Sequence, residues 1–99
     1  MIVTKTLDND RLIVAVDGRL DTLTAPELQK ELLPALKGVR TLEFDMSNLV
    51  YISSAGLRAL MILLQAMDGE NGKIRVLNAN EAVKEIFEIT GLTDVLGVE

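Results

Sequence analysis

Two different hydrophobic periodicities alternate along this 99-residue chain, and the alternation limits the folds that the chain can adopt. Four segments have the character of strands, and in most of them apolar residues recur at every second position: Ile2–Leu7, Leu12–Asp17, Thr41–Met46 and Lys73–Leu77. Helical spacing, close to 3.6 residues, governs three further segments that follow the second, third and fourth strands. The chain is therefore expected to contain strands and helices in alternation.

Local signals place the ends of these elements. The turn residues Asp8, Asn9 and Asp10 predict a tight antiparallel hairpin, and Gly18 is expected to end its second strand. Thr24 and Glu27 have the spacing of a capping box, which predicts that the first helix begins there.

The later helices are expected to begin after Ser53 and after Asn78 or Asn80. The residues predicted to face the core from the three helices are Leu28, Leu32, Leu33 and Leu36, then Leu57, Leu60, Met61, Leu64 and Met67, then Val83, Ile86, Phe87 and Thr90. The pattern leaves open the type of a short final element at Leu92–Val98.

The order of elements is strand, strand, helix, strand, helix, strand, helix. This order predicts an α/β fold with two layers, in which a mixed sheet of four to five strands has helices mainly on one face. The clear alternation in Thr41–Met46 agrees with this arrangement, because a sheet covered on both faces needs strands that are apolar throughout. The length suits a single domain over residues 1–99.

Composition excludes several kinds of function. The chain has no histidine and no cysteine, which rules out Ser-His-Asp triads, histidine phosphorelays, thiolate nucleophiles and cysteine-type zinc sites. We therefore expect no catalytic residues, no metal and no cofactor, and we expect that the protein is not an enzyme. The absence of cysteine also fits a cytoplasmic protein.

Charge and hydropathy narrow the choice of partner. The formal net charge is −5, and the ten lysines and arginines form no cluster, so nucleic acid is not expected to be the partner. The longest apolar stretch, Leu57–Met67, is too short to span a bilayer and contains Arg58 and Gln65. Membrane insertion is therefore not expected, and a protein partner is.

The segment from Asp45 to Leu60 carries the chemistry of greatest interest. It runs from a strand through a loop to a helix start, where Ser53 is suited to cap the helix and Ser54 would keep a free hydroxyl. A phosphate on Ser54 would meet the first-turn amides and the positive end of the helix dipole, so it would not unfold the domain. Equally, two serines before an apolar helix can serve as a cap and nothing more.

This segment resembles the signature of STAS-domain anti-sigma factor antagonists, which is a strand ending in Asn or Asp, a short loop, and then Asp-Ser-Ser/Thr-Gly-Leu-Gly. Alignment on Gly56-Leu57 places Ser54 on the phosphorylated serine of the family, with Ser53 as the alternative, and Asp45 on its conserved polar residue. The chain departs from the pattern at Ser53, where the family has Asp, and at Arg58, where it has Gly.

Two further motifs occur in the order that the family shows. Gly18-Arg19-Leu20-Asp21 with Thr24-Ala25 resembles its Gly-x-Leu-Asp-x-x-x-Ala segment, in which the aspartate lies near the phosphorylated serine. The stretch Ala82–Phe87 with Thr90-Gly91-Leu92 resembles its last helix and the glycine that ends it. The resemblance thus covers nearly the whole chain.

The resemblance implies a partner-switching protein. In its unphosphorylated form it would bind an anti-sigma factor that is also a serine kinase with a Bergerat-type ATP site, and so release a sigma factor. Phosphorylation of Ser54 would end the binding and a phosphatase would restore it, while ATP and metal belong to the kinase. The residues expected to contact the partner are Asp21, Asp45, Ser53, Ser54, Ala55, Gly56, Arg58 and Ile62.

Two other interpretations remain open. The chain can be a STAS scaffold subunit of a larger transport or signalling complex, in which Ser54 belongs only to a helix cap; the departures at Ser53 and Arg58 favour this. Alternatively, Asp21, Asp45 and Ser54 can converge beside one helix start and hold a ligand that carries a phosphate, although no glycine-rich phosphate loop supports this.

Overall fold

A computed structural model describes all residues from 1 to 99 as five strands and three α-helices. The elements in chain order are β1 (Ile2–Asp8), β2 (Arg11–Leu20), α1 (Ala25–Leu32), a 3₁₀ helix (Leu33–Leu36), β3 (Thr41–Asp45), β4 (Leu49–Ile52), α2 (Ser54–Gly69), β5 (Lys73–Leu77) and α3 (Glu81–Ile89). Every strand and helix predicted from the periodicity is present. No helix combines the length and the apolar character that crossing a bilayer requires.

The five strands form one mixed sheet, as predicted. Its main order is β1-β2-β3-β5, with β1 antiparallel to β2 and the other pairs parallel. Asn9 has a positive φ of 56° in the two-residue turn that joins β1 to β2, a conformation that asparagine tolerates better than most residues. The hairpin expected from Asp8, Asn9 and Asp10 is therefore confirmed.

Two details of the sheet differ from the prediction. Gly18 does not end β2: the strand passes through it with a φ of 98° and continues to Leu20, and the partner strand has one extra residue, Val50, at this point. The segment Leu49–Ile52 is not a loop but β4, which pairs in parallel with the extension of β2. From Gly18 onward β2 thus has a different parallel neighbour, and this pairing brings the start of α2 to the end of β2.

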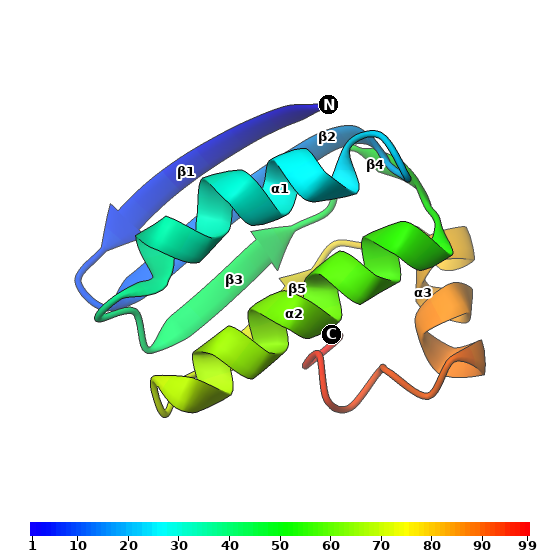
Figure 1. The fold of residues 1–99 in the computed structure, drawn as a ribbon. Helices are drawn as coiled ribbons and strands as arrows, with labels where there is room; N and C mark the ends of the chain where they lie inside the picture. The colour runs from blue at the N-terminus through cyan, green and yellow to red at the C-terminus, as the bar shows by residue number, and fades with distance from the viewer.

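The helices lie mainly on one face of the sheet. Figure 1 shows α1 and α2 side by side across that face, while α3 lies at the end of the molecule near β4. The final segment forms no separate strand, although Val98 bridges to Val76 of β5 and Leu96 is buried. The two-layer arrangement with one covered face is confirmed.

The core is aliphatic apart from Phe44 and Phe87, but the predicted helix stripes need correction. Leu33 and Thr90 are exposed. In α2 the predicted residues Leu57, Met61 and Leu64 are only partly buried, and the fully buried set is Gly56, Ala59, Leu60, Leu63 and Met67. The reason is that α2 is apolar around most of its circumference, so periodicity alone does not define which side faces the sheet.

The opposite face of the sheet carries ion pairs that centre on Glu43. Glu43 of β3 is only 6% exposed. Its Oε1 lies 3.6 Å from Arg11 Nη1 on β2 and 3.1 Å from Arg75 Nη1 on β5. Arg75 also binds Glu99, with 2.7 Å between Nη2 and Oε2. Because a buried carboxylate is tolerated only when it is paired, these two arginines make Glu43 acceptable inside the sheet.

Replacing Glu43 should therefore cost more than replacing an exposed partner of a salt bridge. We expect Glu43→Ala to lower the free energy of unfolding by about 1–3 kcal/mol, because two charge-assisted contacts are lost. The control is Glu31→Ala, which removes the exposed Lys5–Glu31 pair at 3.5 Å and should cost below about 1 kcal/mol. Urea unfolding of both variants measures the difference, and equal losses would contradict this role of Glu43.

Candidate functional site

The candidate site is built on the start of α2. Ser53 has an extended backbone, and its Oγ accepts a hydrogen bond from the Gly56 N–H at 3.3 Å. The N–H of Ser53 donates to the Leu20 carbonyl at the end of β2, with an N–O distance of 2.9 Å. The prediction that Ser53 caps this helix is confirmed, and the cap is tied to the neighbouring strand.

Ser54 is the first residue of α2, and its side chain is available to solvent. It is exposed, and its hydroxyl makes no hydrogen bond to another residue. No acidic residue occupies the first turn of α2, so the positive end of the helix dipole is not neutralised locally. The two adjacent serines therefore differ: Ser53 is bound into the fold and Ser54 is free.

Gly56 has a different role from the one predicted. It was expected to contact a partner, yet it is buried against β2 and β4. A Cβ at this position would lie 2.7 Å from the Leu20 carbonyl oxygen and 2.8 Å from Cγ1 of Ile52. The missing side chain thus allows the protein's own strands, rather than a partner, to approach α2. Gly56 positions Ser53 and Ser54 but offers no surface of its own.

Asp21 organises the turn between β2 and α1. Its Oδ1 accepts the backbone N–H groups of Leu23 and Thr24 at 3.0 Å and 3.1 Å. These hydrogen bonds, the one from Thr24 above all, hold the pKa of Asp21 below its usual value, and the nearby Arg19 acts in the same direction. Asp21 is therefore an anion at neutral pH. It directly follows Leu20, so it lies next to the strand end that binds Ser53.

The capping box predicted from Thr24 and Glu27 is absent. Thr24 precedes α1, but its side chain makes no capping hydrogen bond. Its Oγ1 instead donates to the Arg19 carbonyl and accepts from the Asp21 N–H, both at 2.8 Å. The hydroxyl that would cap the helix is thus used within the turn.

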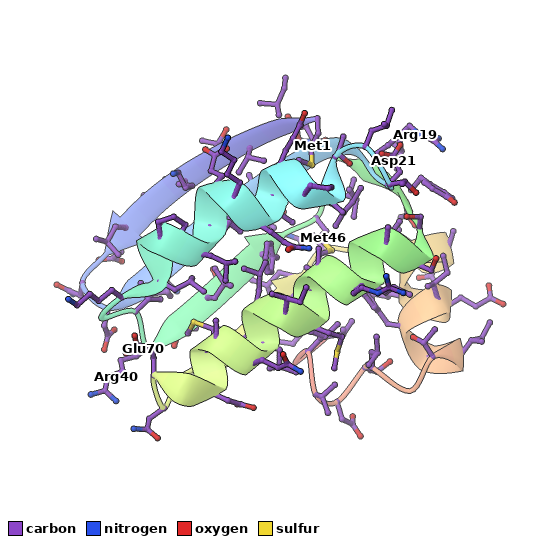
Figure 2. The ribbon with its side chains drawn as sticks, viewed as in Figure 1. Met1, Arg19, Asp21, Arg40, Met46 and Glu70 are labelled. Carbon is purple, nitrogen blue, oxygen red and sulfur yellow. The ribbon has the colours of Figure 1, made fainter.

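A group of exposed side chains next to Asp21 was not anticipated from the sequence. The Arg19 guanidinium lies 3.7 Å from Asp21 Oδ2 and 4.3 Å from the centre of the Tyr51 ring on β4. Figure 2 shows Arg19 and Asp21 together at this end of the molecule. Leu23 is 81% exposed and Val50 63% exposed. The sequence did not reveal these residues because Val50 and Tyr51 belong to a segment expected to be a loop, so the pairing of Tyr51 with Arg19 was not foreseen.

Asp45 lies elsewhere. Its Oδ1 accepts hydrogen bonds from Asn78 Nδ2 at 3.2 Å and from the Ser47 N–H at 3.1 Å. In the register of β2, Asp45 pairs with Ala15 whereas Ile52 pairs with Leu20, so roughly 15 Å of strand separates Asp45 from the start of α2. Asp21, Asp45 and Ser54 therefore do not converge around one ligand, and that interpretation is wrong.

The exposed flank of α2 continues the surface that begins at Ser54. Arg58 follows one turn later, is exposed and takes part in no ion pair. Ala55 and Ile62 are partly exposed beside it. The flank thus combines a free hydroxyl, a free cation and small or apolar side chains, a composition that suits contact with a protein.

The packing of Gly56 generates a stability prediction. Gly56→Ala should lower the free energy of unfolding by about 1–3 kcal/mol, because the new methyl group collides with the backbone of β2. Gly69→Ala is the matched control within the same helix, since a Cβ there meets nothing within 4 Å. Urea midpoints of the two variants provide the comparison. A Gly56→Ala protein as stable as the control would show that this close approach is unimportant.

Asp45 generates a prediction about pH. Hydrogen bonds from Asn78 and Ser47 hold the pKa of the Asp45 carboxyl below its usual value in the folded protein. Protonation therefore favours the unfolded chain, and this contribution to stability is lost as the pH falls through the ordinary aspartate value of about 3.8 and on through the lowered pKa of the folded state. Asp45→Asn should lose less stability than the wild type over this range, as measured by urea unfolding at each pH. If Asp45→Asn and the wild type lose the same amount of stability over this range, Asp45 is not responsible for the pH dependence.

Comparison with known proteins places this geometry in a family. The whole chain, residues 1–99, matches the STAS domain. Over 86 residues it is 34% identical to the anti-sigma-B factor antagonist of Staphylococcus aureus, an alignment that covers 86% of this chain and 80% of that protein.

Solved structures show the same fold. The structure of the anti-sigma factor antagonist SpoIIAA in its unphosphorylated form superposes with a TM-score of 0.87 at 16% identity, covering 99% of this chain and 88% of that one. The Bacillus cell fate determinant SpoIIAA in its phosphorylated form gives 0.78 at 15% identity, covering 99% and 91%. The resemblance inferred from the sequence motifs is thus confirmed, and the chain belongs to the STAS domain family.

Proposed function

We propose that this protein is an anti-sigma factor antagonist, which acts by binding another protein and not by catalysing a reaction. The relatives named in this way in Staphylococcus aureus and Staphylococcus epidermidis support the proposal. So do the SpoIIAA structures, which have the same fold in unphosphorylated and phosphorylated forms. The absence of histidine and cysteine agrees with a regulatory rather than a catalytic role.

Ser54 is the proposed phosphorylation site, and one observation carries this choice. The two serines at the start of α2 have separate tasks: Ser53 holds the helix cap and binds β2, whereas Ser54 is exposed with an unbound hydroxyl. A kinase can reach the hydroxyl of Ser54 without breaking the cap. Modification of Ser53 would instead place the phosphate on the oxygen that accepts the Gly56 N–H and forms the cap.

The proposed partner surface surrounds Ser54. It comprises Asp21 and the residues of the α2 flank, extended by the exposed side chains of Leu23 and Tyr51 that the sequence alone did not suggest. Ser53 contributes through its position, and a partner would reach Asp45 only if it also extended from the start of α2 to the end of β3. The partner is an anti-sigma factor that is itself a serine kinase and supplies its own ATP and metal, and a phosphatase reverses the modification.

The position of Ser54 explains how phosphorylation would end binding without unfolding the domain. A phosphate adds about −1.5 to −2 charges at neutral pH. The unbonded amides and the dipole at the start of α2 stabilise that charge. A partner packed over the same turn instead meets an added, strongly solvated anion. The modification therefore opposes binding while it leaves the fold intact.

A capture experiment with four baits tests this function. The baits are the wild type, Ser54→Ala, Ser54→Asp and Asn71→Asp, each immobilised and exposed to lysate of the native host. Asn71→Asp is the matched control, because it adds the same charge in the turn after α2, at the far end of that helix from Ser54. We expect mass spectrometry to identify a protein with a Bergerat-type ATP site on every bait except Ser54→Asp.

A second step checks the modified residue itself. When the captured protein is supplied with ATP and Mg²⁺, the wild type should gain one phosphate, located at position 54, and Ser54→Ala should gain none. If all four baits retain the same partner and neither serine is modified, the switch is wrong and the chain is a scaffold subunit.

A further inference from the structure

Arg58 is the one charged side chain of the α2 flank. The proposed function gives it no role beyond belonging to the partner surface. Arg58 is exposed and makes no ion pair, unlike the arginines at positions 11, 19 and 75. No carboxylate lies on its own helix within reach, since the first turn has no acidic residue and the next turn carries Met61 and Ile62. The guanidinium is thus held on the surface with no partner in the unmodified protein.

The spacing between Arg58 and Ser54 is that of neighbours on one helix face. Residues four apart on an α-helix have Cβ atoms roughly 5–6 Å from each other, and an anion placed before a cation is the favourable order. An arginine can bind a phosphate through two parallel N–H···O contacts, which a lysine cannot reproduce. A phosphate on Ser54 would therefore lie within reach of a guanidinium that has no competing partner.

A second arginine at the same end of the molecule is less suited to this task. Arg19 lies on β2, where Asp21 and the ring of Tyr51 already bind its guanidinium. To reach a phosphate on Ser54 it would have to leave both contacts. Arg58 loses no ion pair within the protein when it moves toward the phosphate.

We infer that Arg58 is the counter-ion of phosphorylated Ser54, so that the chain binds its own phosphate. This inference rests on the proposed function only for the choice of Ser54 as the modified residue. One modification then changes the flank twice, because it adds an anion and also removes a free cation from the surface that a partner meets. A partner that contacts Arg58 through an acidic group loses that contact at the moment it encounters the phosphate.

The inference is tested on the isolated 99-residue protein, without any kinase or anti-sigma factor. Phosphoserine is incorporated at position 54 by chemical synthesis, and thermal unfolding is compared with and without the phosphate in the wild type, Arg58→Gln and Arg40→Gln. Arg40 is a matched control, since it is exposed, is in no ion pair and is labelled in Figure 2 at the end of the molecule where α2 terminates. The same comparison of thermal unfolding with and without the phosphate is made in Arg19→Gln.

We expect the phosphate to raise the midpoint temperature roughly 2–4 °C more in the wild type than in Arg58→Gln. Arg40→Gln and Arg19→Gln should keep the full gain. In NMR spectra the Nε–H resonance of Arg58 should shift on phosphorylation and exchange more slowly with water, a change that a purely structural role of Arg58 would not produce. Arg58→Lys should recover only part of the thermal gain.

Two outcomes would overturn the inference. An equal gain in Arg58→Gln, with an unchanged Nε–H resonance, would show that the helix amides alone accommodate the phosphate. A gain that disappears in Arg19→Gln instead would assign the counter-ion to Arg19. Because no partner is present, either failure leaves the proposed antagonist function standing, and a failure to bind any kinase would not affect this measurement.

Discussion

The contact between the start of α2 and the end of β2 is the constraint on which the candidate site depends. Gly56 lets the helix approach until a methyl group would collide with the Leu20 carbonyl, and the N–H of Ser53 donates to that same carbonyl. Residues on either side of this contact are thereby fixed relative to each other. Asp21 follows Leu20 and Ser54 follows Ser53, so two distant segments of the chain form one surface.

This contact also separates the part of the site that maintains the fold from the part that is free to change. Ser53, Gly56 and Leu20 are occupied by hydrogen bonding and packing, whereas Ser54 and Arg58 bind nothing within the protein. The remainder of α2 is held by Leu60, Leu63 and Met67 in the core. A charge added to Ser54 therefore acts on the surface, because the interactions that maintain the helix lie on its other side.

Much of this arrangement could be predicted from residue patterns. The period-two strands, the hairpin turn and the cap at Ser53 are each determined by interactions within a few residues, and the structure confirms them. The incorrect predictions concern features that tertiary contacts determine. β4 has only four residues, with its two exposed positions adjacent, so it shows no alternation, and only its pairing with β2 defines it as a strand. In the same way, the apolar circumference of α2 obscured its buried side.

The misreading of Gly56 and Thr24 has a related cause. A glycine after a serine pair fits either an external partner or an internal strand, and a threonine before a helix fits either a cap or a turn. In both cases the answer depends on what lies opposite in space, here Leu20 for the glycine and Arg19 for the threonine. The family resemblance pointed to Ser54 as the modified serine, and the structure shows that its neighbour Ser53 is the residue committed to the fold.

We propose that phosphorylation of Ser54 changes the surface and leaves the fold unchanged. Amide ¹H–¹⁵N NMR spectra of the protein with serine and with phosphoserine at position 54 test it most directly. We expect shifts confined to the first turns of α2, the end of β2 and the turn at Asp21, with the resonances of β3 and β5 unchanged. Shifts spread through the sheet, or a collapse of spectral dispersion, would contradict it.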